Sequence, residues 1–95
     1  MLHIFINSPF NVDINSLCNL INKEDDIIAI QDGVIISLKN NIFLRKIISF
    51  SKNLYVLKED LDARGLVTKI SKNFSIVNYS DFVNLTVKNK SQIRW

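Results

Sequence analysis

Cys18 is the only cysteine of the chain and therefore its only candidate for a nucleophilic or sulfur-carrying thiol. It lies on an apolar stripe with Ile14, Leu17 and Ile21, at the spacing of one helix face. Reactive thiols occupy electropositive, partly exposed surroundings, and the asparagines around Cys18 supply no positive charge. The pattern favours a buried structural cysteine, and a catalytic thiol that carries a persulfide is the alternative.

The only histidine, His3, falls inside a short apolar segment over residues 2–6, where we expect it to be packed or hydrogen-bonded in the core. Without it, no Ser–His–Asp or Cys–His pair can be assembled. One histidine and one cysteine far apart in the sequence are also a weak set of metal ligands. With two glycines, the chain has no Gly-rich phosphate loop. We therefore expect no metal site, no cofactor and no catalytic set within this chain.

Polar residues follow the predicted strands, at the edge where α/β sheets bind ligands. Asp32 and Gly33 form a tight turn in which Gly33 can adopt a positive φ, and this turn can border a cleft shared with a partner. Asp60 and Arg64 are four residues apart and are expected to form an ion pair across a helical turn. Gly65 is expected to end that turn in the left-handed conformation.

The elements that position these residues alternate between strands and helices. Asn11 or Asp13 can cap the first helix and Ser80 the last, while residues 34–38 fit either a further apolar stretch or the first turns of a helix. The expected strands cover 2–6, 26–30, 53–57 and 74–77, and the expected helices cover 14–21, 42–50, 59–64 and 80–89. This order predicts one α/β domain over residues 1–95, a three-layer α/β/α arrangement with a roughly five-stranded, mainly parallel sheet.

The same fold carries phosphoacceptor receiver domains, which need an acidic cluster after the first strand. Asn7, Ser8 and Pro9 occupy that position here, so we exclude this class. The amino-terminal residues lack the basic region and the length of a signal peptide, and no apolar run is long enough for a membrane span. We expect a cytoplasmic protein that does not contact a membrane.

Apolar residues make up 47% of this short chain, more than a small core needs, so part of the apolar surface is expected to contact a partner. The expected interface residues are Asp32, Gly33, Phe82 on the last helix, and Trp95, which can add a final strand or dock on a neighbour. The formal net charge of +3 is modest. A tRNA-binding surface using Lys88, Lys90 and Arg94 is a further alternative to a mixed-charge, solvated surface.

Short motifs occur in order along essentially the entire chain, and together they resemble the TusB/DsrH family of sulfur-relay proteins, the TusB type most closely. None of these motifs is specific alone. They are Met1-Leu2-His3, Ser8-Pro9-Phe10, Gln31-Asp32-Gly33-Val34, Tyr55-Val56-Leu57, Glu59-Asp60, Ala63-Arg64-Gly65-Leu66, Tyr79, Asp81-Phe82-Val83, Leu85-Thr86-Val87-Lys88, Ser91-Gln92 and Trp95.

The resemblance implies a DsrE/F/H-like fold and a heterohexamer, a dimer of trimers built with TusC- and TusD-like subunits. In that family a cysteine of the D subunit accepts sulfur as a persulfide. A TusE-like carrier passes the sulfur on for 2-thiolation of the tRNA wobble uridine, which implies that this chain has no direct contact with tRNA. The B-type subunit is regarded as architectural, which implies a non-catalytic part of a sulfurtransferase complex. DsrH-type relatives place a cysteine near Cys18, so a DsrH-like carrier in sulfur oxidation is the alternative.

Overall fold

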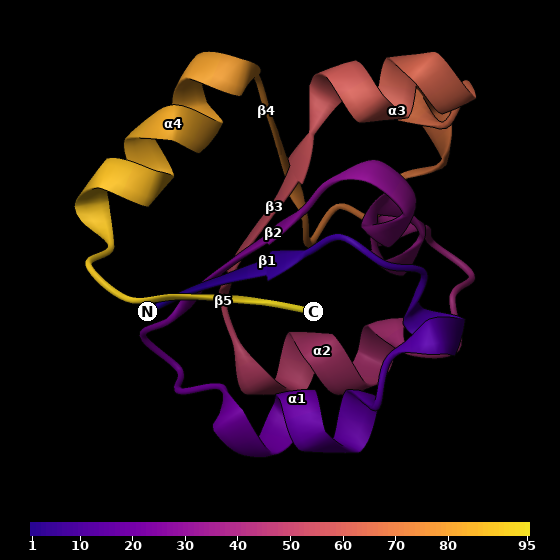
Figure 1. The fold of residues 1–95 in the computed structure, drawn as a ribbon. Coiled ribbons are helices and arrows are strands. Elements are labelled where there is room, and N and C mark those ends of the chain that lie inside the picture. Colours follow the sequence, from indigo (N-terminus) through magenta and orange to yellow (C-terminus); the bar gives the residue numbers. More distant parts are fainter.

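The computed structural model describes residues 1–95, in which strands alternate with helices from one end of the chain to the other (Figure 1). The strands are β1 (Leu2–Phe5), β2 (Asp26–Ala29), β3 (Asn53–Leu57), β4 (Ser75–Val77) and β5 (Gln92–Arg94). The α-helices are α1 (Ile14–Leu20), α2 (Leu44–Phe50), α3 (Lys58–Arg64) and α4 (Tyr79–Lys88). Three short 3-10 helices are η1 (Pro9–Asn11), η2 (Gln31–Ser37) and η3 (Val67–Lys69).

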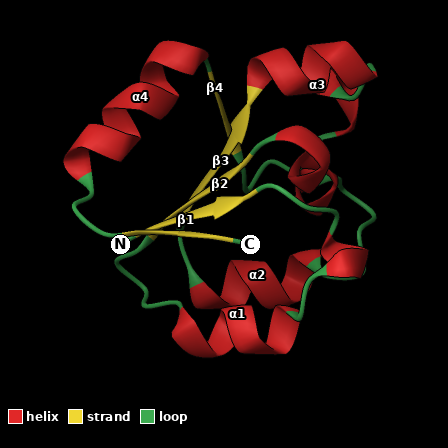
Figure 2. Ribbon diagram, in the orientation of Figure 1, coloured by secondary structure: helices red, strands yellow, loops and turns green.

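The five strands form one sheet in the order β4-β3-β2-β1-β5, and every pair of neighbours is parallel. Helices α1 and α2 lie on one face, and α3 and α4 lie on the other (Figure 2). This arrangement confirms the predicted three-layer α/β/α fold with a five-stranded parallel sheet. None of the helices has the length and apolar character required to span a membrane.

The two faces of the sheet carry apolar clusters of unequal size. A cluster of 15 buried residues includes Phe5 of β1 and Leu17 of α1, whereas a cluster of 6 includes Ile4 of β1 and Leu85 of α4. Neighbouring strand residues point to opposite faces, so a strand covered on both faces needs apolar residues without alternation. Burying one such side chain fully stabilises the fold by roughly 1.5–3 kcal/mol.

The ends of the helices follow from local side-chain hydrogen bonds. The side chain of Asp13 accepts a hydrogen bond from the main-chain N–H of Ser16 and caps α1, which confirms one of the two predicted caps. The prediction for Ser80 is wrong, because α4 begins at Tyr79 and is capped by Asn78. Asn78 accepts from the N–H of Asp81, and the Asp81 carboxylate accepts from the N–H of Asn78. This capping box leaves Ser80 inside the first turn.

The carboxyl-terminal residues form the fifth strand. β5 pairs in parallel with β1, with Ile93 opposite His3. The main-chain carbonyl of Trp95 accepts hydrogen bonds from the N–H groups of Ile6 and Asn7. The first and last strands of the chain are therefore neighbours, and β5 occupies one edge of the sheet.

Candidate functional site

Cys18 lies on α1 and faces the larger apolar cluster, where 2% of its surface is exposed. Burial raises the pKa of its thiol, and the positive charge of Lys46 on α2 lowers that pKa only in part. The ammonium of Lys46 is itself bonded to the amide oxygen of Asn15. A thiolate is the species that accepts or donates sulfur, so this environment opposes sulfur transfer and supports a packing role for Cys18.

His3 forms the centre of a buried chain of hydrogen bonds and has no exposed surface. Its Nε2 lies 2.9 Å from Oδ2 of Asp25, and its Nδ1 accepts a hydrogen bond of 3.1 Å from the indole N–H of Trp95. An indole N–H can only donate, so Nδ1 carries no proton and Nε2–H donates to Asp25. Because His3 is fully buried, the hydrogen bonds of Asp25, His3 and Trp95 join parts of the fold that are far apart in the sequence.

Asp25 is the anchor of that chain. Burial alone would raise the pKa of its carboxyl, but three hydrogen bonds together hold that pKa below its usual range. The donors are the main-chain N–H of Asn22, the ring of His3 and the amino-terminal ammonium of Met1. Asp25 is thus a structural anion that connects β1 to the turn before β2.

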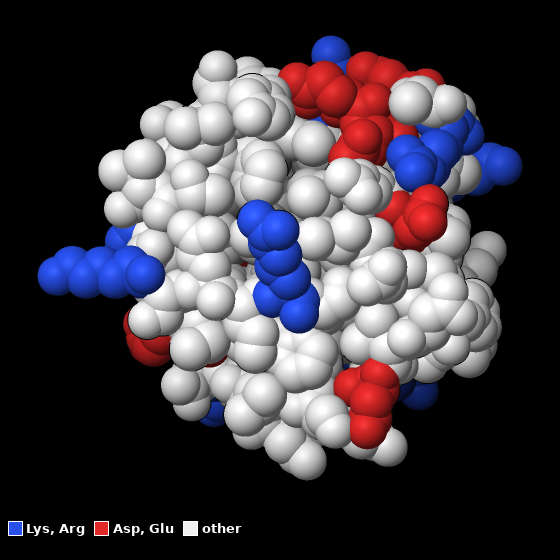
Figure 3. Space-filling view, in the orientation of Figure 1, with Lys and Arg blue, Asp and Glu red and all other residues white.

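The acidic residues of α3 bind main-chain groups of neighbouring elements. The carboxylate of Asp60 accepts a hydrogen bond of 2.7 Å from the N–H of Gln31, a residue with a φ of 51°. Glu59 accepts a bond of 3.0 Å from the N–H of Tyr79 at the start of α4. Figure 3 shows acidic side chains gathered over α3, while most of the rest of that face carries no charge. These carboxylates hold the loops at the carboxyl edge of the sheet and are not a free acid pair.

The prediction of an ion pair between Asp60 and Arg64 is wrong. The guanidinium of Arg64 instead lies 3.0 Å from the carboxylate of Asp32, and it contacts Asp60 only through the main-chain carbonyl. A tertiary contact explains this difference, because the carboxylate of Asp60 is already hydrogen-bonded to the N–H of Gln31. Gly65 ends α3 with a φ of 65°, which confirms the predicted left-handed cap.

Position 33 requires a glycine because the main chain of Phe5 passes close to it, and not because of the φ angle of the residue. The expectation of a positive φ is wrong for Gly33, since Gln31 is the residue in this turn that adopts one. The N–H of Gly33 bonds to the carbonyl of Ile6, and a side chain at Gly33 would clash with the carbonyl of Phe5. Residues 34–38, whose structure the sequence left open, continue the 3-10 helix η2 through Ser37.

The residues expected to contact a partner are spread over the molecule. Asp32 is exposed beside Arg64, whereas Gly33 is buried. Phe82 is half-buried against the smaller apolar cluster and contacts the ring of Tyr79. Trp95 is half-buried against the larger cluster and stacks on His3. Asp32 and Gly33 are thus neighbours in η2, whereas Phe82 and Trp95 pack against different apolar clusters, so the four residues do not form one patch.

The basic residues weighed for RNA contact are only partly free. The ammonium of Lys88 lies 3.4 Å from the carboxylate of Asp26, which is buried and also accepts a hydrogen bond from Asn89. Lys90 and Arg94 are exposed. The structure contains no group of three or more His, Cys, Asp or Glu side chains placed to hold a metal ion.

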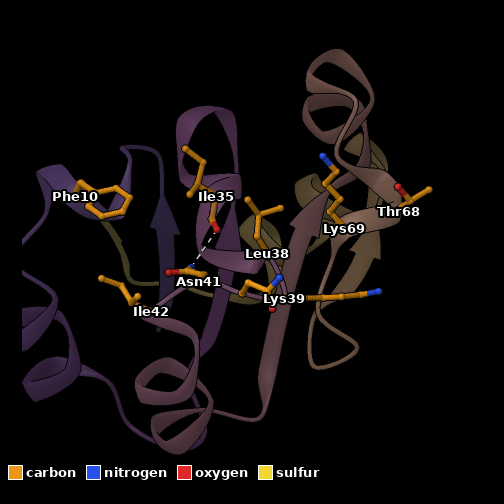
Figure 4. A pocket seen from close by; sticks show the side chains of 9 residues that line it. Phe10, Ile35, Leu38, Lys39, Asn41, Ile42, Thr68 and Lys69 are labelled. Carbon is orange, nitrogen blue, oxygen red and sulfur yellow. Dashed lines mark hydrogen bonds between the residues drawn. The ribbon is translucent and has the colours of Figure 1, made fainter.

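Sequence reasoning missed an open groove of about 560 Å³ between η1, η2 and η3 (Figure 4). It is lined by four apolar residues, by three uncharged polar residues and by the two lysines Lys39 and Lys69. The exposed apolar side chains of Phe10 and Ile42, in segments rich in polar residues, are the only local signal for it.

Comparison with known proteins identifies relatives over the full length of the chain. The model of the family described as DsrH like protein matches residues 7–92. Protein TusB of Buchnera aphidicola subsp. Schizaphis graminum is 53% identical over 95 residues, covering 100% of both chains. Protein TusB of Erwinia tasmaniensis is 43% identical with the same coverage. These matches confirm the resemblance seen in the motifs.

Solved structures support the fold alone. Protein MTH1491 from Methanobacterium thermoautotrophicum, described as of unknown function, superimposes with a TM-score of 0.71 at 14% identity, covering 99% of this chain and 97% of the other. Protein Tm0979 from Thermotoga maritima gives a TM-score of 0.64 at 24% identity, covering 96% and 97%.

Proposed function

Since the chain belongs to the DsrH-like family, we propose that it is a subunit of a TusBCD-type sulfurtransferase complex in the cytoplasm. In this role it serves the sulfur relay for 2-thiolation of the tRNA wobble uridine. The full-length identity of 53% to a TusB protein is the observation that carries this proposal. The partners are TusC- and TusD-like subunits in a dimer of trimers. A TusE-like carrier interacts with this chain only as part of the complex, and the chain does not bind tRNA directly.

Within that complex, the chain is architectural and does not carry the sulfur. Its only thiol is 2% exposed, and the pKa of that thiol is raised by burial. Several large apolar side chains remain exposed, as expected of a subunit that buries them against partners, namely Phe10, Leu20, Ile42, Ile76, Tyr79, Val83 and Val87. Tyr79, Val83 and Val87 recur every four residues on α4, so they form one apolar stripe on the outside of that helix.

The test is complementation in a bacterial strain whose own copy of this subunit is deleted. Thiolated wobble uridine in tRNA is measured after return of the wild-type chain, of Cys18→Ala, or of an empty vector. We expect the wild type and Cys18→Ala to restore thiolation to about the same level, because the thiol is dispensable. Loss of thiolation with Cys18→Ala in a folded protein would make Cys18 a sulfur carrier. Thiolation that is unchanged by the deletion would disprove the proposed relay.

Native mass spectrometry of the chain co-expressed with the TusC and TusD homologues of the same organism tests the assembly. A particle with two copies of each subunit is expected. A chain that stays alone at micromolar concentrations would contradict the architectural role.

A further inference from the structure

The groove between the 3-10 helices is a feature of the surface that the proposed function leaves unused. Phe10 comes from η1 after β1, Ile35 from η2 after β2, and Lys69 from η3 before β4. Because η1 and η2 follow β1 and β2, this part of the groove lies beyond the carboxyl ends of those two strands, at the edge where α/β sheets bind their ligands. Its volume of about 560 Å³ is within the range of specific binding sites.

The groove has an apolar end and a basic end. Figure 4 shows Phe10 and Ile42 on one side, and Lys39 and Lys69 on the opposite side beyond Leu38. Phe10 and Ile42 are 70% and 76% exposed, which is unusual for side chains of this size. An occupant that matches this surface needs an apolar group at one end and an anion at the other.

The walls of the groove are held in place by hydrogen bonds and ring contacts. The amide of Asn41 donates to the carbonyl of Ile35 at 3.0 Å and accepts from the N–H of Phe43 at 2.8 Å. The ring of Phe10 packs edge-on against that of Phe43, with 5.3 Å between centroids. A surface that is ordered before binding loses little conformational entropy when it is occupied.

The basic end has no anion of its own. No Asp or Glu lines the groove, and neither Lys39 nor Lys69 takes part in a salt bridge. The N–H of Lys39 bonds to the carbonyl of Lys69, so the main chains of the two lysines lie side by side, while their side chains extend in different directions from this contact (Figure 4).

We propose that this groove docks a segment of a sister subunit in which a bulky apolar side chain stands close to an Asp or Glu. The apolar side chain lies between Phe10 and Ile42, and the carboxylate pairs with Lys39 or Lys69. This inference rests on the proposed function, since it assumes that the chain assembles with TusC- and TusD-like proteins. A nucleic-acid backbone would pair with the lysines but would leave the apolar end exposed to water.

The first experiment places a photoreactive benzoylphenylalanine at Ile42 in the co-expressed complex. The control is the same group at Leu20, an exposed apolar residue of α1. We expect Ile42 to cross-link to a sister subunit, at a segment with Asp or Glu within about one helical turn. A complex that forms without this cross-link, or a cross-linked segment without an acidic residue, would overturn the docking proposal.

The second experiment reverses the charge of the basic end. Lys39→Glu/Lys69→Glu is compared with Lys23→Glu/Lys52→Glu, which makes the same charge change at exposed residues that precede strands, at the other end of the sheet. The groove variant should raise the dissociation constant of the complex at least about tenfold, and the control by less than about twofold. Equal effects would overturn the docking site alone. A wild-type chain that never assembles would overturn the proposed function and the docking site together.

Discussion

The indole N–H of Trp95 donates a hydrogen bond to Nδ1 of His3, which joins two residues that are 92 positions apart. We expect Trp95→Phe to keep a ring over His3 and to lose the donor, so that a buried nitrogen is left without a partner. The free energy of unfolding should fall by about 1–2 kcal/mol in urea titrations. Tyr55→Phe is the control, because half-buried Tyr55 makes no side-chain hydrogen bond to another protein group and the loss of its hydroxyl should change stability little. An unchanged midpoint for Trp95→Phe would show that the bond adds nothing to stability.

The ring proton of His3 should be on Nε2, because Nδ1 accepts from Trp95 and Nε2 donates to Asp25. The 15N chemical shifts of the ring distinguish this tautomer from the other one and from the imidazolium. Trp95→Phe should make the tautomer less uniform, since the donor that selects it is gone. A ring that carries its proton on Nδ1 in the wild type would contradict the geometry of the buried chain.

Asp25 should make stability depend on pH in the acidic range. The pKa of its carboxyl is held below its usual range, so its contribution is present above the unfolded-state pKa and is lost as pH falls through the folded-state pKa. Asp25→Asn should therefore lower the free energy of unfolding by about 2 kcal/mol at pH 7, and the difference should shrink as the pH falls from about 5 to 2. Asp62→Asn, at an exposed site on α3, is the control. A difference in unfolding free energy between the wild type and Asp25→Asn that grows toward low pH would contradict this prediction.

The two glycines should respond differently to a methyl group. Gly33→Ala should cost about 3 kcal/mol, because the new atom would clash with the carbonyl of Phe5 and β1 cannot move without loss of its pairing. Gly65→Ala meets no atom within 4 Å and should cost only about 1 kcal/mol, from its φ of 65°. Thermal unfolding of both variants checks the order, and a reversed order would show that the close approach at Gly33 is relieved by a small shift.

Cys18 should react slowly with thiol reagents while the protein is folded. Its side chain is buried and the pKa of its thiol is raised by that burial, so modification requires the local opening of α1. We expect a rate at least about a hundredfold below that of Ser80→Cys in a Cys18→Ala background, since residue 80 is exposed. In urea the two thiols should react alike. Equal rates in the folded state would mean that Cys18 is accessible.

Features that depend on neighbouring residues in the sequence were predictable. β3 covers residues 53–57 as expected, because an apolar run between polar turns is sufficient to identify a buried strand. The ends of the other predicted elements differ from the structure by a residue or two. Asn78 caps α4 in place of Ser80, because the capping box of Asn78 and Asp81 satisfies more main-chain donors.

Features that depend on tertiary contacts were not predictable from local pattern. Arg64 pairs with Asp32 and not with the residue four positions before it, because η2 and α3 meet only in the folded chain. Gly33 is needed because the main chain of Phe5 passes beside it. The groove combines segments from three connections, so no single stretch of the sequence contains its pattern. The composition, with 47% apolar residues, predicts that some apolar side chains are exposed, but it does not predict where they lie.

The pairing of β5 with β1 has a consequence for synthesis on the ribosome. β5 is made after the other four strands, yet its partner is the first of them. Until it emerges, β1 presents an unpaired edge of main-chain N–H and carbonyl groups to other nascent chains, and such edges are sites of aggregation. Truncation before β5 should therefore leave a chain that is prone to aggregation.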